Sequence, residues 1–176
     1  MSGSLPIRNV AEINLIKEYC KRKGKVRELL MFTLAINTGI NLKDLLALRV
    51  KDVKDKLYLN LSRNKSIPLN EELLSLISLA VEGKNGADYL FQTDSGLPLN
   101  RVTAFNIFKE IYFELGLNEK YSVSSWRKTF AYHYYNKYQD LAYLMWLNNQ
   151  STVKTALDFI GLEENMNLRF REGVCL

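Results

Sequence analysis

The sequence predicts a mainly α-helical fold with one small antiparallel β-sheet, an α+β class, from three kinds of observation. Apolar residues recur at helical spacing through most of the 176 residues. One stretch, 56–69, changes instead to the apolar–polar alternation of strands. Short breaks rich in Gly, Asn and Pro separate these segments, and the chain length suits a single domain with its own core.

The first part of the chain contains three predicted helices. The spacing of apolar residues predicts a helix over about 7–23, and Gly24 provides a natural end. The run 26–37 is apolar on nearly all sides, which predicts a buried helix. After a break, a short helix over 41–48 is expected to begin with Asn41 as its N-cap.

A β-hairpin is predicted next. The runs 56–62 and 65–69 alternate apolar and polar residues on either side of a break at Arg63-Asn64. Pro68 is expected at a sheet edge or strand end, because proline lacks the backbone donor. We also expect a strand near 50–53.

Helices return in the second part of the chain. Asn70 is expected to cap a helix whose first turn carries Glu71 and Glu72. Further helices are predicted over about 100–115, 123–138, 140–147 and 151–160, the last with Ser151 as its N-cap.

The net charge of +5 is unevenly distributed along the chain. Residues 1–70 carry +8, whereas residues 71–176 carry −3. A one-sided basic surface suits a polyanion such as DNA, because cations displace condensed counterions when they meet phosphates. The same pattern also suits helix faces that lysines keep solvated, so charge alone leaves both interpretations open.

The composition argues against several kinds of site. A single histidine, His133, and the isolated Cys20 and Cys175 make a zinc site very unlikely. We expect no cofactor, and neither a phosphate-binding loop nor an acyl-transfer triad is indicated. No apolar run is long enough to span a membrane, so we expect no membrane partner. Because the two cysteines form no disulfide framework, we expect a reducing cytoplasm.

Four stretches together resemble the tyrosine recombinases, also called the phage integrase family. "LLMFTLAINTGINLKDLLALRVKDV" (29–53) resembles the first conserved box, which reads like "TGLRISELLxLxxxDI". "SVSSWRKTFAYHYY" (122–135) resembles the second, "HxLRHTFATHLL". The predicted hairpin lies where such enzymes carry a lysine, and "LNNQSTVKTALDFIG" (147–161) resembles "LxHSSxxxTxRYIG". The resemblance covers about residues 6–161 and implies the tyrosine recombinase catalytic-domain fold.

The resemblance also implies a domain organisation. We expect one integrase-like catalytic-domain fold over 1–176, with 1–5 as a tag or disordered end and 163–176 as a C-terminal tail. The core-binding domain that most members place before this region is expected to be absent.

The chemistry implied by the family proceeds through a tyrosine. Its hydroxyl attacks a DNA phosphodiester and forms a covalent phosphotyrosyl bond. Two arginines and histidine-type donors stabilise the charge that develops on the phosphorus oxygens. A lysine on the hairpin protonates the leaving 5′ oxygen.

Carried over onto this sequence, most of these reactive positions are changed. The first-box arginine falls at Asn41 and the second-box histidine at Ser124. The later histidine falls at Gln150, and the nucleophilic tyrosine falls at Phe159. Because phenylalanine offers no nucleophile, the resemblance implies a degenerate catalytic site.

Other positions of the family pattern are kept. Arg127 matches the second-box arginine, with a structural salt bridge to Asp44 as its alternative role. Lys65 is the nearest candidate for the hairpin lysine, and Arg63 is another cation in reach. Asp44 matches the acidic partner in the first box, and His133 matches a non-catalytic, structural histidine.

These observations predict an integrase-like protein that binds duplex DNA and does not cut it, for example a regulator or accessory subunit of a mobile element. The DNA-binding candidates are Arg127, Lys65, Arg63, Lys43, Arg49 and Lys51, together with Lys17, Lys21, Arg22 and Lys25. Two alternatives stay open. One is an active recombinase with an altered site, and the other is an interaction module that meets a recombinase or a second copy through its C-terminal tail.

Overall fold

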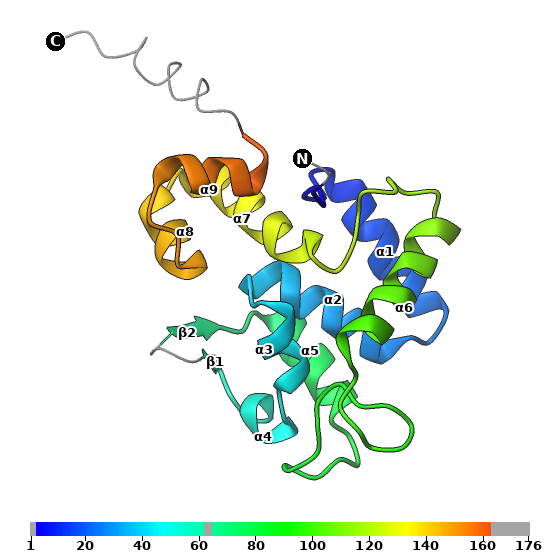
Figure 1. Cartoon of the computed structure of the whole chain (residues 1–176). Helices are drawn as coiled ribbons and strands as arrows, with labels where there is room; N and C mark the ends of the chain where they lie inside the picture. Colours follow the sequence, from blue (N-terminus) through cyan, green and yellow to red (C-terminus); the bar gives the residue numbers. More distant parts are fainter. Residues whose placement is uncertain (1–2, 62–64, 163–176) are drawn as a thin grey trace, which may run out of the picture.

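The computed structural model describes residues 3–61 and 65–162 (Figure 1). In chain order the elements are α1 (Val10–Arg22), α2 (Val26–Thr38), α3 (Leu42–Ala47), α4 (Val50–Val53), β1 (Tyr58–Leu61), β2 (Lys65–Pro68), α5 (Glu71–Ala80), α6 (Arg101–Glu114), α7 (Ser125–Tyr138), α8 (Leu141–Asn148) and α9 (Val153–Ile160). The predicted class, mainly helical with one small antiparallel sheet, is confirmed. No helix in these ranges combines the length and apolar character needed to cross a bilayer.

Helix α2 forms the centre of the main core. Its residues from Leu29 to Ala35 are buried, as the apolar run predicts, and it packs against α1, α5 and α7. Phe32 of α2 contacts Phe108 of α6 and Trp126 of α7, with Trp126 and Phe108 ring centroids 4.5 Å apart. This aromatic contact fixes the first turn of α7, where the second box lies.

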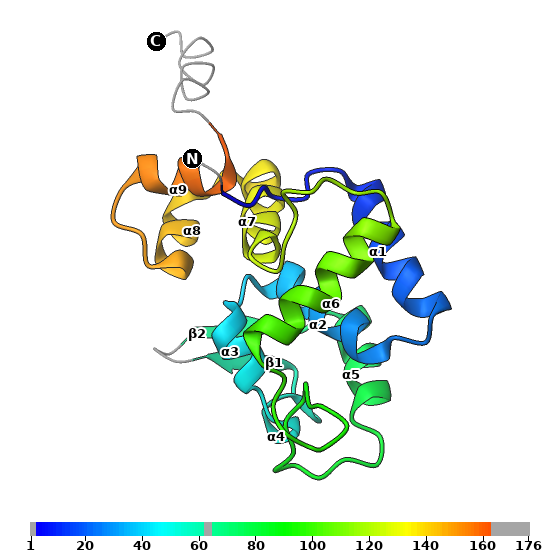
Figure 2. The same cartoon turned by 45° about the vertical axis from the view of Figure 1, so that its right-hand side comes forward.

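Helices α7, α8 and α9 gather at one side of the molecule around a smaller buried cluster (Figure 2). Ala131 and Tyr135 of α7 meet Leu144 of α8 and Leu157 and Ile160 of α9. This burial holds α9, which carries the third conserved stretch, against α7.

The hairpin forms as predicted. β1 and β2 pair antiparallel with Leu59 opposite Ile67, and both of these side chains are buried. Pro68 is the last residue of β2, where it pairs with Tyr58 at the end of the ladder. Arg63 lies outside the described residues.

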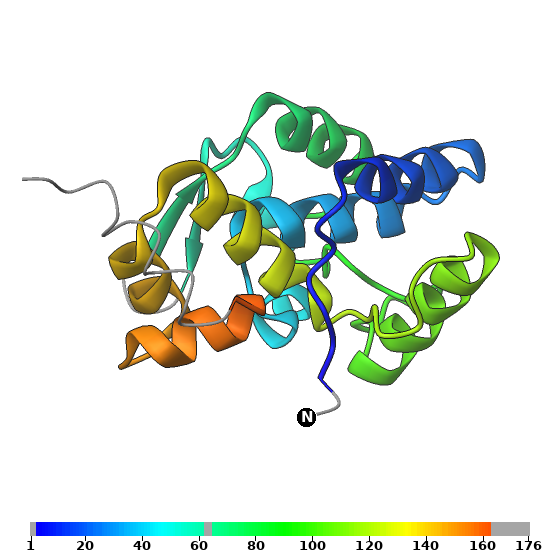
Figure 3. The same ribbon diagram turned by 90° about the horizontal axis from the view of Figure 1, so that it is seen from above.

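The segment before α1 runs across the molecule to α7 (Figure 3). The Ile7 amide donates to Thr129 Oγ1 at 2.9 Å, and His133 Nε2 lies 3.0 Å from the Ile7 carbonyl oxygen. Arg8 Nη2 donates to the Gly161 carbonyl at 2.6 Å, at the C-terminal end of α9. His133 therefore joins α7 to the N-terminal segment through a hydrogen bond, which supports the structural role expected for it.

Two local predictions are wrong. The stretch 50–53 is the short helix α4 and not a strand, because the Lys54 amide donates to the Val50 carbonyl and Asp52 caps the turn by accepting from the Arg49 amide at 2.8 Å. The N-cap of α9 is Thr152 instead of Ser151, since Thr152 Oγ1 accepts from the Thr155 amide.

Candidate functional site

A pocket of about 610 Å³ lies where the start of α3 meets the first turns of α6 and α7 and the end of α9. Four positions of the expected reactive set line it, namely Asn41, Ser124, Arg127 and Phe159. Asn41 precedes Ser124 by 83 positions, and Phe159 follows Arg127 by 32. The fold therefore brings together the positions that the resemblance aligned.

A second, smaller pocket of about 220 Å³ adjoins the first. Asn41 and Arg127 line both pockets, and Asp44 and Lys65 line only the smaller one. The side chain of Arg127 therefore lies between the two spaces, with Lys65 on one side and Phe159 on the other.

Gln150 does not join this group. It lines neither pocket, and its Nε2 donates to the Thr155 carbonyl at 3.2 Å within the turn before α9. Its Oε1 is buried and has no hydrogen-bond partner among the described residues. The side-chain amide of Gln150 therefore stabilises the turn between α8 and α9.

Asn41 is the N-cap of α3, as predicted. Its Oδ1 accepts from the Asp44 amide at 2.9 Å, and its Nδ2 donates to Asp44 Oδ2 at 2.6 Å. The oxygen and the nitrogen of the Asn41 side-chain amide therefore both bind Asp44. This position carries no charge, and its hydrogen-bonding groups are used at the start of α3.

Arg127 is a partly buried cation with few partners. Its Nη2 donates to the Leu147 carbonyl at 3.4 Å, while its Nε is buried and has no hydrogen-bond partner in the described part of the chain. Within the same ranges it makes no ion pair with Asp44. Burial lowers the pKa of Arg127, and the charge of Asp44 opposes that shift.

Two cations lie over the Phe159 ring. The Arg127 guanidinium carbon and Lys128 Nζ are each 5.8 Å from the ring centroid. Lys128 Nζ also donates to the Ser4 carbonyl at 2.6 Å, and burial lowers its pKa. The ring provides a polarisable face to the two cations and no hydroxyl.

Lys65 is held by the carboxyl end of α8. Its Nζ donates to the Trp146 carbonyl at 2.8 Å, the Leu147 carbonyl at 2.9 Å and Asn149 Oδ1 at 3.2 Å, and it lies 4.8 Å from the Trp146 ring centroid. The negative end of a helix dipole favours a cation there. Lys65 thus lies beside Arg127, and its role as a proton donor stays a prediction.

The remaining DNA-binding candidates divide by position. Lys43 is exposed and lines the larger pocket. Arg49 and Lys51 line neither pocket and belong to the α4 region, at the opposite end of the molecule from α9 in Figures 1 and 2. Arg49 stacks on Tyr89, with 4.3 Å between its guanidinium carbon and the ring centroid.

Two cations of the larger pocket are missing from the sequence-based candidates. Lys128 directly follows Arg127, so its position in the second box could have indicated it. Arg101 begins α6, outside every conserved stretch, and only the folded chain places it in the pocket wall.

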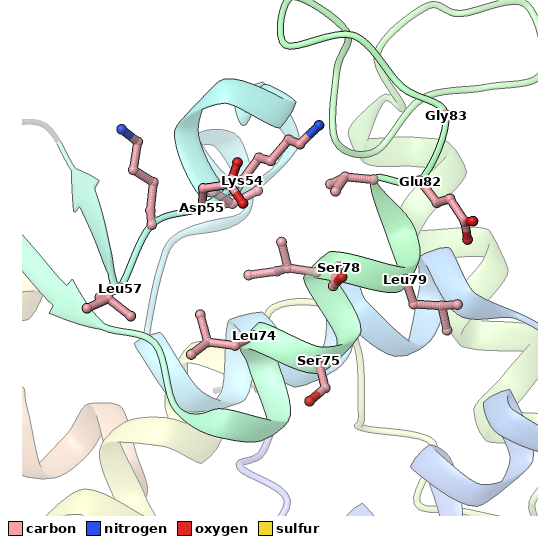
Figure 4. Close-up of a pocket in the computed structure, with 13 residues that line it drawn as sticks. Lys54, Asp55, Leu57, Leu74, Ser75, Ser78, Leu79, Glu82 and Gly83 are labelled. Atoms are coloured by element: carbon pink, nitrogen blue, oxygen red, sulfur yellow. The ribbon is translucent and has the colours of Figure 1, made fainter.

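A third hollow, of about 1090 Å³, lies between the α4–β1 connection and α5 (Figure 4). Its charged lining residues have both signs, Lys54 and Lys56 against Asp55 and Glu82, and none of the expected reactive positions reaches it. It therefore lacks the one-sided charge of the first pocket. Nowhere in 3–61 or 65–162 do three His, Cys, Asp or Glu side chains gather as a metal site would require.

Comparison with known proteins identifies the family. The model of the phage integrase family matches residues 9–158. The probable integrase/recombinase YoeC of Bacillus subtilis (strain 168) is 32% identical over 166 residues, which cover 91% of this chain and 91% of that protein.

Solved structures share the fold. XerA recombinase superimposes with a TM-score of 0.78 at 15% identity, over 99% of this chain and 66% of that one. The Tn1549 transposon integrase, in complex with circular intermediate DNA, gives 0.76 at 16% identity, over 97% and 65%. A form of that integrase with a tyrosine-to-phenylalanine substitution, in complex with transposon right end DNA, also gives 0.76 at 16% identity, over 96% and 65%. This chain spans just under two thirds of those solved chains, it has the fold of the tyrosine recombinase catalytic domain, and it belongs to the phage integrase family.

Proposed function

We propose that this phage integrase family member binds duplex DNA without cutting it. One observation carries the proposal. Among the described residues, the charged side chains that line the larger pocket are all cations, and Phe159 on the same wall falls where the family pattern has its nucleophile. The lining cations are Lys43, Arg101, Arg127 and Lys128.

The binding half of the proposal is supported by the incomplete compensation of the Arg127 charge, which Asp44 only partly offsets. A buried cation is costly unless an anion or hydrogen-bond acceptors replace its lost water. Arg127 has a buried Nε without a partner and one long hydrogen bond at 3.4 Å. A backbone phosphate oxygen supplies both the negative charge and the acceptor, and arginine binds phosphate strongly. DNA is therefore the polyanion that best satisfies this pocket.

The non-cutting half is supported by the loss of several groups at once. Phe159 carries no hydroxyl, Asn41 is neutral and bound to Asp44, and Ser124 replaces a histidine of the family pattern. Removing even one donor that stabilises the transition state typically costs about 10²–10³ in rate. The Tn1549 integrase form with a tyrosine-to-phenylalanine substitution is itself a DNA complex, so such an exchange is compatible with DNA binding in that relative.

In the cell we propose a regulatory or accessory role for this protein in the cytoplasm. A chain that occupies recombination sites without cleaving them can compete with an active integrase or position it. This role extends the shared integrase fold and the proposed chemistry of the pocket.

A salt titration tests DNA binding. Fluorescence anisotropy with a labelled duplex is expected to give a logarithmic plot of affinity against salt with a clearly negative slope, because each phosphate contact contributes roughly −0.9. Affinity that is undetectable at low salt, or independent of salt, would overturn the proposal. Dimerisation in the same samples without DNA affinity would favour the interaction-module alternative.

A nicked suicide substrate tests the absence of cleavage. On a denaturing gel, we expect no covalent protein–DNA adduct from the purified chain, with an active tyrosine recombinase as the positive control. An adduct would establish the active-recombinase alternative instead.

A further inference from the structure

We propose that Lys128 is a second phosphate-binding cation, which together with Arg127 holds one backbone phosphate beside the Phe159 ring. This inference rests on the proposed function and assigns a role to a residue that the family pattern leaves without one. The ligand is a phosphate oxygen of a DNA strand that enters the larger pocket.

The geometry places the two cations as a pair. Arg127 and Lys128 are consecutive residues in the first turn of α7, and both line the same pocket. Each lies 5.8 Å from the Phe159 ring centroid, measured from the guanidinium carbon and from Nζ. Since Phe159 belongs to α9, docking of α9 on α7 keeps both cations around one space.

The charge balance of this space is incomplete. Among the residues that the structure describes, no carboxylate lines the larger pocket. The hydrogen bond to the Ser4 carbonyl uses one of the three donors of the Lys128 ammonium group. Burial lowers the pKa of Lys128, and no charged neighbour offsets that shift. An anion between Arg127 and Lys128 would supply the missing compensation.

The pair also replaces what this sequence lacks. The family pattern places an arginine at Asn41 and a histidine at Ser124, and here both positions are neutral. Lys128 reaches the same pocket from the position next to Arg127. In this proposal two cations still bind one phosphate, and Lys128 takes the place of the cation that the family pattern has elsewhere in the pocket.

The main alternative is that Lys128 serves only to tie the N-terminal segment to α7 through the Ser4 carbonyl. Lys128→Gln separates the two roles, because glutamine retains an N–H donor for that carbonyl and loses the charge. Lys128→Arg keeps both the donor and the charge. Lys137→Gln is the matched control, since Lys137 is an exposed lysine farther along the same helix.

The experiment is the anisotropy salt titration on the full chain and these three variants. For Lys128→Gln we expect the salt slope to become shallower by about 0.9 and affinity at low salt to fall at least about tenfold. Lys128→Arg is expected to restore most of the affinity, and Lys137→Gln to match the unmodified chain. An unchanged slope in Lys128→Gln, or an equal loss in Lys137→Gln, overturns the inference while leaving DNA binding intact.

Thermal denaturation with inorganic phosphate gives a readout that does not depend on DNA binding. At matched ionic strength in chloride, phosphate is expected to raise the melting temperature of the unmodified chain and of Lys137→Gln more than that of Lys128→Gln. Equal shifts in all three overturn the two-cation site. A chain that binds no duplex but shows the unequal shifts would refute the proposed function and retain the site.

Discussion

Cations in the α1 region and cations in the larger pocket have different surroundings. Lys17 on α1 forms an ion pair with Glu72 at 2.8 Å, so its charge is neutralised within the chain. In the part of the chain that the structure describes, no carboxylate lines the pocket of Arg127 and Lys128, and neither side chain forms an ion pair. Lys65 belongs with the first kind, since carbonyl groups of α8 hold its ammonium group. We call the first kind committed, because partners within the chain hold their charge, and we expect them to stabilise the fold. We call Arg127 and Lys128 uncommitted, and we expect them to be available to a ligand.

The difference also shows where a linear charge count misleads. The excess of +8 in residues 1–70 suited a DNA-binding surface in the N-terminal half and suited solvated helix faces equally well. Arg101, Arg127 and Lys128 of the pocket come from residues 71–176, which carry −3 in total. Which cations can bind a phosphate depends on the ion pairs of the folded chain, and not on the net charge of a stretch of sequence.

The largest expected effect comes from removing a committed cation. Lys65→Met removes the charged donor that the Trp146 and Leu147 carbonyls share, which is expected to lower the free energy of unfolding by about 2–3 kcal/mol. Urea denaturation measures this loss as a lower midpoint at constant slope. Lys56→Met is the matched control, because Lys56 is exposed just before β1. A Lys65→Met chain as stable as the control would show that the contact with α8 contributes little.

Removing an uncommitted cation should give the opposite pattern. Arg127→Gln is expected to weaken duplex binding more than about tenfold, because a charge-assisted contact with phosphate is lost. Its stability should change by less than about 1 kcal/mol, since only one long hydrogen bond disappears.

Arg22→Gln, at the exposed end of α1, is the control for this measurement. If Arg22→Gln weakened binding as much as Arg127→Gln, the distinction between the two groups of cations would fail.

A smaller effect is expected from breaking the ion pair on α1. Glu72→Gln removes the partner of Lys17 and should lower the free energy of unfolding by at most about 1 kcal/mol, as is usual for exposed pairs. Because Lys17 does not line the pocket, duplex affinity should change less than about twofold. Fluorescence anisotropy measures the duplex affinity of Glu72→Gln. A several-fold gain in that affinity would show that α1 contacts DNA.

The smallest effect is expected from restoring the hydroxyl. Phe159→Tyr should give no covalent adduct with a nicked duplex, because Asn41 and Ser124 remain neutral and Gln150 stays bound in its turn. Its duplex affinity should equal that of the unmodified chain, which shows that the variant is folded. An adduct from this single variant would mean that the retained Arg127 supports cleavage almost alone.

Local patterns predicted most of the secondary structure because they act over a few residues. Asn41 and Asn70 cap α3 and α5 as expected, since each side-chain oxygen accepts an amide three residues ahead. The strand expected over 50–53 was wrong because strand-like pairing there is limited to the bridge between Arg49 and Tyr89, after which Asp52 caps a helical turn.

The sequence by itself determined the family and the fold class, and it led to the prediction that Phe159 stands at the nucleophile position, because these depend on residue identity and on spacing along the chain. Only the tertiary structure decided which charges remain uncommitted. Arg127 and Lys128 meet Phe159 through the docking of α9 on α7, and Lys65 is bound at the end of α8. Electrostatic compensation depends on distances through space, which residue order does not contain.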